Sequence, residues 1–83
     1  MNTGAVYWAR ELDIPSAQKL ILMLLAAESS QDNHADVRTI DPCMSPPVFN
    51  RHLFRLWQKG LIAHVFRDGV CTHQYRLNVG ARV

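Results

Sequence analysis

The sequence lacks a hydrophobic run long enough to cross a membrane. Its longest strictly apolar run, residues 20–27, has eight residues, whereas a membrane-spanning helix needs roughly 20. The first residues contain no basic region followed by an apolar stretch, which is the pattern of a secretory signal. We therefore expect a cytoplasmic protein with no membrane partner. The two cysteines, Cys43 and Cys71, allow at most one disulfide, and we expect reduced thiols in that compartment.

Motifs that indicate an enzyme are also missing. The sequence has no Gly-rich phosphate loop, no nucleophile elbow and no paired carboxylates at a catalytic spacing. We therefore predict no enzyme, no catalytic residues and no cofactor. His64, Cys71 and His73 gather on one face of a predicted hairpin, but a fourth zinc ligand and a Cys-x-x-Cys spacing are both absent. We predict a hydrogen-bonded histidine pair beside a thiol there, and no metal site.

The composition is that of one small globular domain. Apolar residues make up 48% of the 83-residue chain and charged residues 19%, and no repeat or long linker interrupts it. The net charge of +2 is unevenly distributed: residues 1–48 hold three basic and six acidic residues, and residues 49–83 hold six basic residues and one acidic residue. The two halves thus carry −3 and +5. A basic half on so small a domain is typical of a protein that binds a polyanion, although the imbalance is also explained by solubility alone.

The first half of the sequence predicts two helical segments and a short third element. Residues 1–13 form an N-terminal arm or a short helix, whose Tyr7 and Trp8 need burial. Residues 16–30 form the first core helix, which is apolar nearly all round and is therefore central in the fold or partly covered by a second subunit. Residues 36–43 form a short second element, in which a strand followed by a short helix is one option.

The second half predicts a well-delimited helix over residues 45–59. Ser45 is a favoured N-cap, Pro46 suits the first helical position, and Gly60 suits the left-handed position that follows a helix. The apolar residues Phe49 and Leu53, with Leu56 one turn later, form one stripe that faces the core.

Residues 61–79 predict a β-hairpin around the two-residue turn Asp68-Gly69. Such a turn fixes a regular register, in which residues 67 and 70, 66 and 71, 64 and 73, and 62 and 75 lie opposite each other. One face of this hairpin then carries mostly polar and basic side chains, Arg67, Thr72 and Arg76 among them.

Two stretches of the sequence carry a resemblance to a known family. The first is Ser45-x-x-x-Phe49-x-x-x-Leu53-x-x-Leu56-x-x-Lys59-Gly60-Leu61-Ile62, and the second is residues 15–27, PSAQKLILMLLAA. They resemble the recognition helix and the first helix of bacterial, phage and plasmid winged helix-turn-helix proteins of the MarR-like or phage replication-protein-like kind. The resemblance covers residues 14–79. It implies a mainly α fold with a C-terminal β-hairpin as the wing, and DNA as the partner.

The resemblance also implies which residues contact double-stranded DNA. Arg51 and Asn50 would read bases in the major groove, because their side chains match guanine and adenine edges. His52 and Arg55 on the helix, like the arginines of the wing, would meet phosphates. The full predicted set is Ser45, Pro47, Val48, Asn50, Arg51, His52, Phe54, Arg55, Arg67, Thr72 and Arg76. The sequence departs from the family at Pro46-Pro47, where members usually carry polar or basic residues.

The function that this pattern favours is a small dimeric transcriptional repressor that occupies promoter DNA. The surplus apolar residues Tyr7, Trp8 and Trp57 are the predicted contacts of a homodimer. Two alternatives remain open: a replication-origin or primosome DNA-binding module, and a winged-helix adaptor that binds a protein partner through Phe54 and Trp57.

Overall fold

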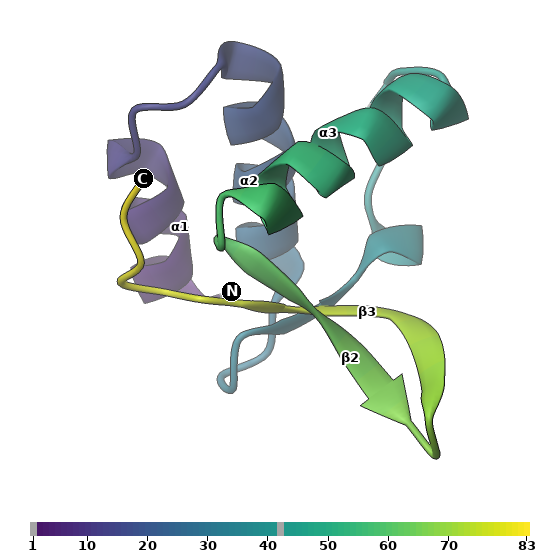
Figure 1. Cartoon of the computed structure of the whole chain (residues 1–83). Coiled ribbons are helices and arrows are strands. Elements are labelled where there is room, and N and C mark those ends of the chain that lie inside the picture. The colour runs from purple at the N-terminus through teal and green to yellow at the C-terminus, as the bar shows by residue number, and fades with distance from the viewer. Residues whose placement is uncertain (1, 42) are drawn as a thin grey trace.

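The computed structural model describes residues 2–41 and 43–83, and over these residues the chain forms three α-helices, one 3-10 turn and three β-strands (Figure 1). The elements are α1 Thr3–Glu11, α2 Ser16–Glu28, β1 His34–Asp36, η1 Val37–Thr39, α3 Pro46–Gln58, β2 Ile62–Arg67 and β3 Val70–Leu77. The predicted hairpin is present, but it is joined by a third strand. The fold is therefore mixed α/β, and the expectation of a mainly α chain with a C-terminal β-hairpin is confirmed only in part.

The N-terminal segment is a helix, the second of the two options for residues 1–13. Asn2 is its N-cap, and the side-chain oxygen accepts a hydrogen bond from the backbone N–H of Ala5 at 3.1 Å. The amide nitrogen of the same side chain donates to the carbonyl oxygen of Ser30 at 3.0 Å. One side chain thus both starts α1 and ties it to the loop after α2. Residues 1 and 42, which fall within the predicted segments 1–13 and 36–43, lie outside the described residues.

Helix α2 is the centre of the core, as its nearly continuous apolar surface predicts. Ile21, Leu22 and Leu25 are completely buried, and α2 packs against both α1 and α3. The helix ends at Glu28, two residues earlier than predicted. Ser29 follows it in an extended conformation, with both its backbone N–H and its hydroxyl donating to the carbonyl of Ala26.

The three strands form one antiparallel sheet in the order β1-β3-β2, so that β3 lies in the middle. The segment predicted at 36–43 does contain a strand followed by a short helix, but the strand begins two residues earlier, at His34. Ala35 lies opposite Tyr75, and Ile62 lies opposite Leu77. Because directly paired residues share a face, these four side chains point to the side of the sheet that is buried against the helices. Beyond this contact, the hairpin projects away from the helices (Figure 1).

Helix α3 begins and ends close to the predicted residues. Ser45 occupies the N-cap position, although its side chain makes no capping hydrogen bond, and Pro46 is the first helical residue. At the other end, Gly60 has a φ of +75°, the left-handed conformation that glycine adopts without a steric penalty. Leu53 and Leu56 are buried against the core, which fixes the opposite side of α3 toward solvent.

The hairpin register is regular only near the turn. Arg67 faces Val70 and Phe66 faces Cys71 as predicted, but His64 faces Tyr75 where the regular register places His73, and Ile62 faces Leu77 where it places Tyr75. The reason is an irregularity: Thr72, His73 and Gln74 of β3 lie against the single residue Val65 of β2.

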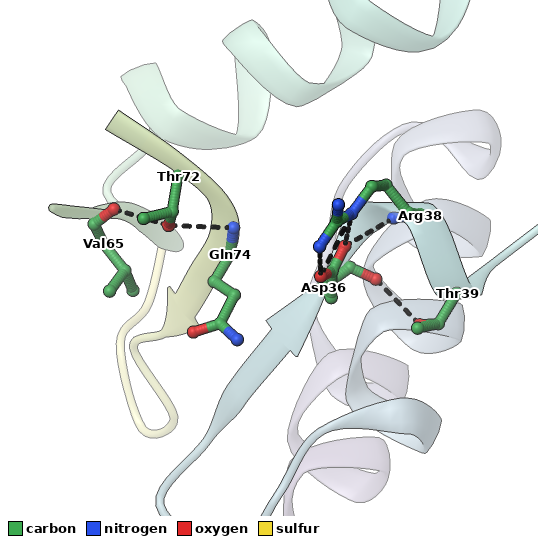
Figure 2. A network of polar contacts seen from close by, with 6 residues as sticks. All are labelled: Asp36, Arg38, Thr39, Val65, Thr72 and Gln74. Atoms are coloured by element: carbon green, nitrogen blue, oxygen red, sulfur yellow. Dashed lines mark hydrogen bonds and ion pairs between the residues drawn. The ribbon is translucent and has the colours of Figure 1, made fainter. Parts of the chain in front are cut away.

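The hydroxyl of Thr72 stabilises this bulge. It donates to the carbonyl oxygen of Val65 at 2.7 Å and accepts from the backbone N–H of Gln74 at 3.1 Å (Figure 2). A side chain thus provides hydrogen bonds that the interrupted ladder does not. The expected pairing of His64 with His73 is wrong for this reason.

Candidate nucleic-acid interface

The solvent side of α3 carries two neighbouring ridges of different chemistry. Asn50, Phe54 and Trp57 follow one another at intervals of four and three residues, so that they form one ridge. Arg51 and Arg55, four residues apart, form the adjacent ridge, and all five residues are exposed. This arrangement results from the burial of Leu53 and Leu56 on the opposite side of the helix.

The structure distributes the predicted DNA-contact residues over exposed and partly buried positions. Eight of them are exposed: Ser45, Pro47, Asn50, Arg51, Phe54, Arg55, Arg67 and Arg76. The other three, Val48, His52 and Thr72, are partly buried. His52 turns its Nδ1 atom inward, where the described residues offer it no hydrogen-bond partner. The Thr72 hydroxyl is engaged in the bulge, so neither side chain is as free to meet a phosphate as the exposed arginines are.

The N-terminus of α3 has little backbone to offer an anion. Helix N-termini bind phosphates through free N–H groups, but Pro46 and Pro47 have none. The N–H of Phe49 is already bonded to the carbonyl of Ser45 at 2.9 Å. Anionic ligands of this helix therefore depend on the arginine side chains.

These arginines form no ion pair with a described residue. Within residues 2–41 and 43–83, the ion pairs are Asp32 with His34 at 3.2 Å and Asp36 with Arg38 at 2.7 Å. Arg51, Arg55, Arg67 and Arg76 take part in neither. Their charges are exposed and uncompensated, which suits a polyanionic partner.

Arg38, unlike these arginines, forms an ion pair with an acidic residue. Its guanidinium and its backbone N–H both donate to the Asp36 carboxylate (Figure 2). These hydrogen bonds, the side-chain ones foremost, lower the pKa of Asp36 from 3.8 to about 2. The charge of Arg38 is therefore neutralised within the fold.

The hairpin arginines do not share the face that adjoins α3. Arg67 pairs with Val70 and Arg76 pairs with Ala63, and neighbouring residues of a strand point to opposite faces. Both arginines therefore project from the face opposite the one that carries His64 and Phe66. Arg67 is next to the turn at the tip of the hairpin, whereas Arg76 lies on the central strand with His34 as its other neighbour.

Between α3 and the hairpin lies a hollow of about 240 Å³. Its lining residues are Asn50, Leu53, Phe54, Trp57, His64 and Tyr75. Burial raises the pKa of Tyr75 above its ordinary value of 10, and the neighbouring Cys71 raises it further. The phenol is thus a neutral hydrogen-bonding group at physiological pH. Cys71 also contacts His64, with 3.3 Å between Sγ and Nδ1.

Sequence reasoning missed this hollow, although it identified Asn50, Phe54 and Trp57 as exposed positions. The contributions of His64 and Tyr75 follow from the bulge, which pairs these two residues directly. The available signal was the alternation of residues 62, 64 and 66, which puts aromatic side chains on the hairpin face that continues from the core.

The predicted dimer residues occupy two separate surfaces. Tyr7 is 59% exposed on α1 and lines a hollow formed with the C-terminal segment, near Gly80 and Ala81. Trp8 is partly buried and its indole N–H donates to the carbonyl of Ala81 at 2.9 Å, so it stabilises the fold of its own chain. Trp57 lies at the α3 hollow, stacked on Phe54.

Among the described residues, no helix is both long and apolar enough to span a membrane. In the same part of the chain, no three His, Cys, Asp or Glu side chains are grouped as a metal site requires. The two cysteines, Cys43 and Cys71, are free and exposed.

Comparison of the chain with known protein families, with curated proteins and with solved structures finds no match.

Proposed function

We propose that this protein binds double-stranded DNA in a sequence-specific manner as a winged helix-turn-helix protein, with α3 in the major groove. One observation carries the proposal: α3 presents Asn50, Arg51 and Arg55 to solvent, and neither arginine has an acidic partner among the described residues. The major groove is about 12 Å wide and admits an α-helix. A helix with free base-reading and phosphate-binding side chains is suited to that groove.

The order of elements supports the winged-helix assignment. A core helix, α2, is followed by a short element, by the exposed helix α3 and by a hairpin that projects beyond the helices (Figure 1). In this assignment, α3 is the recognition helix and β2 with β3 is the wing. The short element is a single 3-10 turn, η1, so the helix-turn-helix is reduced to its recognition helix and a minimal preceding turn.

Three exposed side chains of α3 have distinct roles in the proposal. The guanidinium of Arg51 donates two hydrogen bonds to a guanine edge, and the amide of Asn50 pairs with adenine. Arg55 contacts a phosphate and sets the register of the helix. Arg67, at the hairpin tip, reaches the flanking backbone, whereas Arg76, in the central strand between Ala63 and His34, lies away from the tip and stays in solvent.

The biological output that we propose is repression by promoter occupancy. In this proposal, the concentration of the protein sets how much of the DNA site is occupied. Two copies on a palindromic site would place two recognition helices about one DNA turn apart.

The test is a comparison of two arginine variants that remove the same charge. A duplex selected from a random pool by the wild-type protein serves as the probe, and fluorescence anisotropy measures the dissociation constant over a range of salt concentrations. Arg51→Ala should weaken binding by roughly 5- to 150-fold and relax the preference at one base pair, because a bidentate base contact contributes about 1–3 kcal/mol. Arg76→Ala should leave the affinity unchanged.

Wild-type affinity should also fall steeply as salt is added, because bound phosphates release counterions. The proposal fails if duplex affinity is insensitive to salt or if Arg51→Ala binds like the wild type. Equal losses in Arg51→Ala and Arg76→Ala would show non-specific attraction in place of groove reading.

A further inference from the structure

Five neighbouring aromatic or imidazole rings form a surface that runs from α3 onto the hairpin; four of these residues are exposed and one, Tyr75, is partly buried. We call this surface the aromatic strip, and its members are Phe54, Trp57, His64, Phe66 and Tyr75. The ring centroids of successive neighbours are 5.7 Å apart for Phe54 and Trp57, 6.3 Å for Trp57 and His64, 6.2 Å for His64 and Phe66, and 4.8 Å for His64 and Tyr75. Groove reading by Asn50 and Arg51 makes no use of it.

The strip offers open ring faces to a ligand. Phe54 is 52% exposed, Trp57 45% and Phe66 62%, and a hollow of about 240 Å³ opens between Phe54, Trp57, His64 and Tyr75. A flat, apolar group is the shape that stacks on such faces. The neutral phenol of Tyr75, which lines the hollow, supplies a hydrogen bond to the edge of that group.

The charge around the strip selects an anionic occupant. Arg51 and Arg55 form the ridge of α3 next to the one that carries Phe54, whereas Arg67, which follows Phe66 in β2, points to the opposite face of the sheet. Residues 49–83 contain only one acidic residue, Asp68, at the hairpin turn. A partner that combines flat apolar groups with a regular series of negative charges is a nucleic-acid strand with unstacked bases.

We propose that the aromatic strip binds unpaired bases of a DNA strand, so that the protein prefers a duplex carrying unpaired nucleotides next to the site that α3 reads. This inference rests on the proposed DNA-binding function of α3. Bases inside a duplex are stacked on each other and cannot offer their faces to the strip, whereas unpaired bases can. Stacking on aromatic side chains tolerates every base, so the strip adds affinity without adding base specificity.

The experiment compares two DNA probes that differ only in unpaired nucleotides. One is the blunt duplex selected by the wild-type protein, and the other is the same duplex with four unpaired thymines at one end, prepared in separate versions for each end and strand. Fluorescence anisotropy gives the ratio of the two dissociation constants. We expect the best tailed duplex to bind at least five-fold more tightly than the blunt one.

The ring variants test whether the strip causes this preference. Trp57→Leu keeps an apolar side chain and removes the flat ring, so the ratio should fall to about one while affinity for the blunt duplex is retained. Trp57→Phe should keep most of the preference. Phe66→Leu, at an exposed residue of the strip outside the predicted set of duplex contacts, is a second, independent variant of the same kind, and circular dichroism checks that each protein is folded. Arg51→Ala should weaken binding to both probes alike and leave their ratio unchanged.

The outcomes separate this inference from the proposed function. A wild-type ratio of one, with salt-dependent binding of the blunt duplex, overturns the inference and leaves the function of α3 intact. A preference for tailed DNA that survives in both Trp57→Leu and Phe66→Leu also overturns it. If neither probe binds, the proposed function fails and this inference fails with it. A different result would assign the strip to a protein partner. In that case the two DNA probes bind equally well, an acidic, tryptophan-containing peptide binds the wild type, and Trp57→Leu abolishes peptide binding.

Discussion

At the scale of single residues, Thr72 determines the geometry of the hairpin. Its partly buried hydroxyl accepts one hydrogen bond and donates another inside the bulge. The bulge in turn pairs His64 with Tyr75 and so brings both rings to the hollow beside α3. One hydroxyl on the sheet thus positions side chains that line the candidate site.

We predict that Thr72→Val, which is nearly isosteric but cannot hydrogen-bond, lowers the free energy of unfolding. The Val65 carbonyl and the Gln74 N–H both lose a partner, and an unsatisfied buried group costs about 1–3 kcal/mol. Because both groups can regain some contact with water, we expect a total loss of about 1–3 kcal/mol. Urea denaturation followed by circular dichroism measures it.

The control for this prediction is Thr72→Ser, which keeps the hydroxyl and removes only a methyl group. It should retain most of the stability that Thr72→Val loses. Equal stability of the valine variant and the wild type would show that the bulge does not depend on the hydroxyl.

At the scale of elements, the short turn η1 depends on Asp36. The carboxylate caps the turn by accepting from the backbone N–H of Arg38 at 2.9 Å and pairs with its guanidinium, while the hydroxyl of Thr39 donates to the Asp36 carbonyl at 2.7 Å. Since the folded-state pKa of about 2 lies below the ordinary 3.8, the carboxylate stabilises the fold above about pH 4. That contribution is lost as the pH falls toward 2.

We therefore predict that Asp36→Asn is less stable than the wild type at pH 7 and that the difference in melting temperature shrinks between pH 4 and pH 2. Thermal unfolding of both proteins at a series of pH values gives this difference directly. Arg38→Ala, which removes the guanidinium but leaves the backbone N–H, should show a smaller pH-dependent difference. A gap between wild type and Asp36→Asn that stays constant down to pH 2 would contradict the assignment.

Elements whose ends are marked by local chemistry could be predicted from the sequence. Pro46 marks the start of α3, because the first residue of a helix does not need a backbone N–H. Gly60 marks its end, because glycine adopts the positive φ found there. The Asp68-Gly69 turn, with φ values of 52° and 77°, is equally local. The strand at His34–Asp36 is three residues long and exists only through its pairing with β3. Its own sequence therefore gave little sign of where it begins.

The residues of the candidate site could likewise be predicted only where the local sequence determines their position. The exposed side of α3 follows from helical periodicity, so Asn50, Arg51 and Phe54 could be identified in advance. The hollow depends on a two-residue shift between β2 and β3, and the regular register of a two-residue turn gives no indication of it. The position of Arg76 relative to α3 could not be predicted either, because it depends on how the sheet packs against the helices and not on the sequence pattern of the hairpin.

At the scale of the whole molecule, exposed aromatic side chains lie on two surfaces. One surface is the aromatic strip on α3 and the hairpin. The other is the hollow between α1 and the C-terminal segment beside it, where Tyr7 is 59% exposed (Figure 1). Arg51 and Arg55 border the first surface, whereas Arg82 is the only basic residue of residues 49–83 that lines the hollow of the second. A second copy of the chain is therefore better accommodated on α1, where it leaves α3 free for DNA.

We predict that the protein forms a homodimer through the α1 surface and that Tyr7→Glu weakens it. A buried carboxylate without a partner is costly at an interface, so sedimentation equilibrium should show at least a ten-fold rise in the dimer dissociation constant. Trp57→Leu is the matched control and should leave that constant unchanged, because the aromatic strip lies outside the contact. On DNA, Tyr7→Glu should lose affinity for a probe with two half-sites but bind a single half-site like the wild type. If Trp57→Leu disrupts the dimer and Tyr7→Glu does not, the strip is the dimer contact, and α3 is then covered by protein in the free dimer.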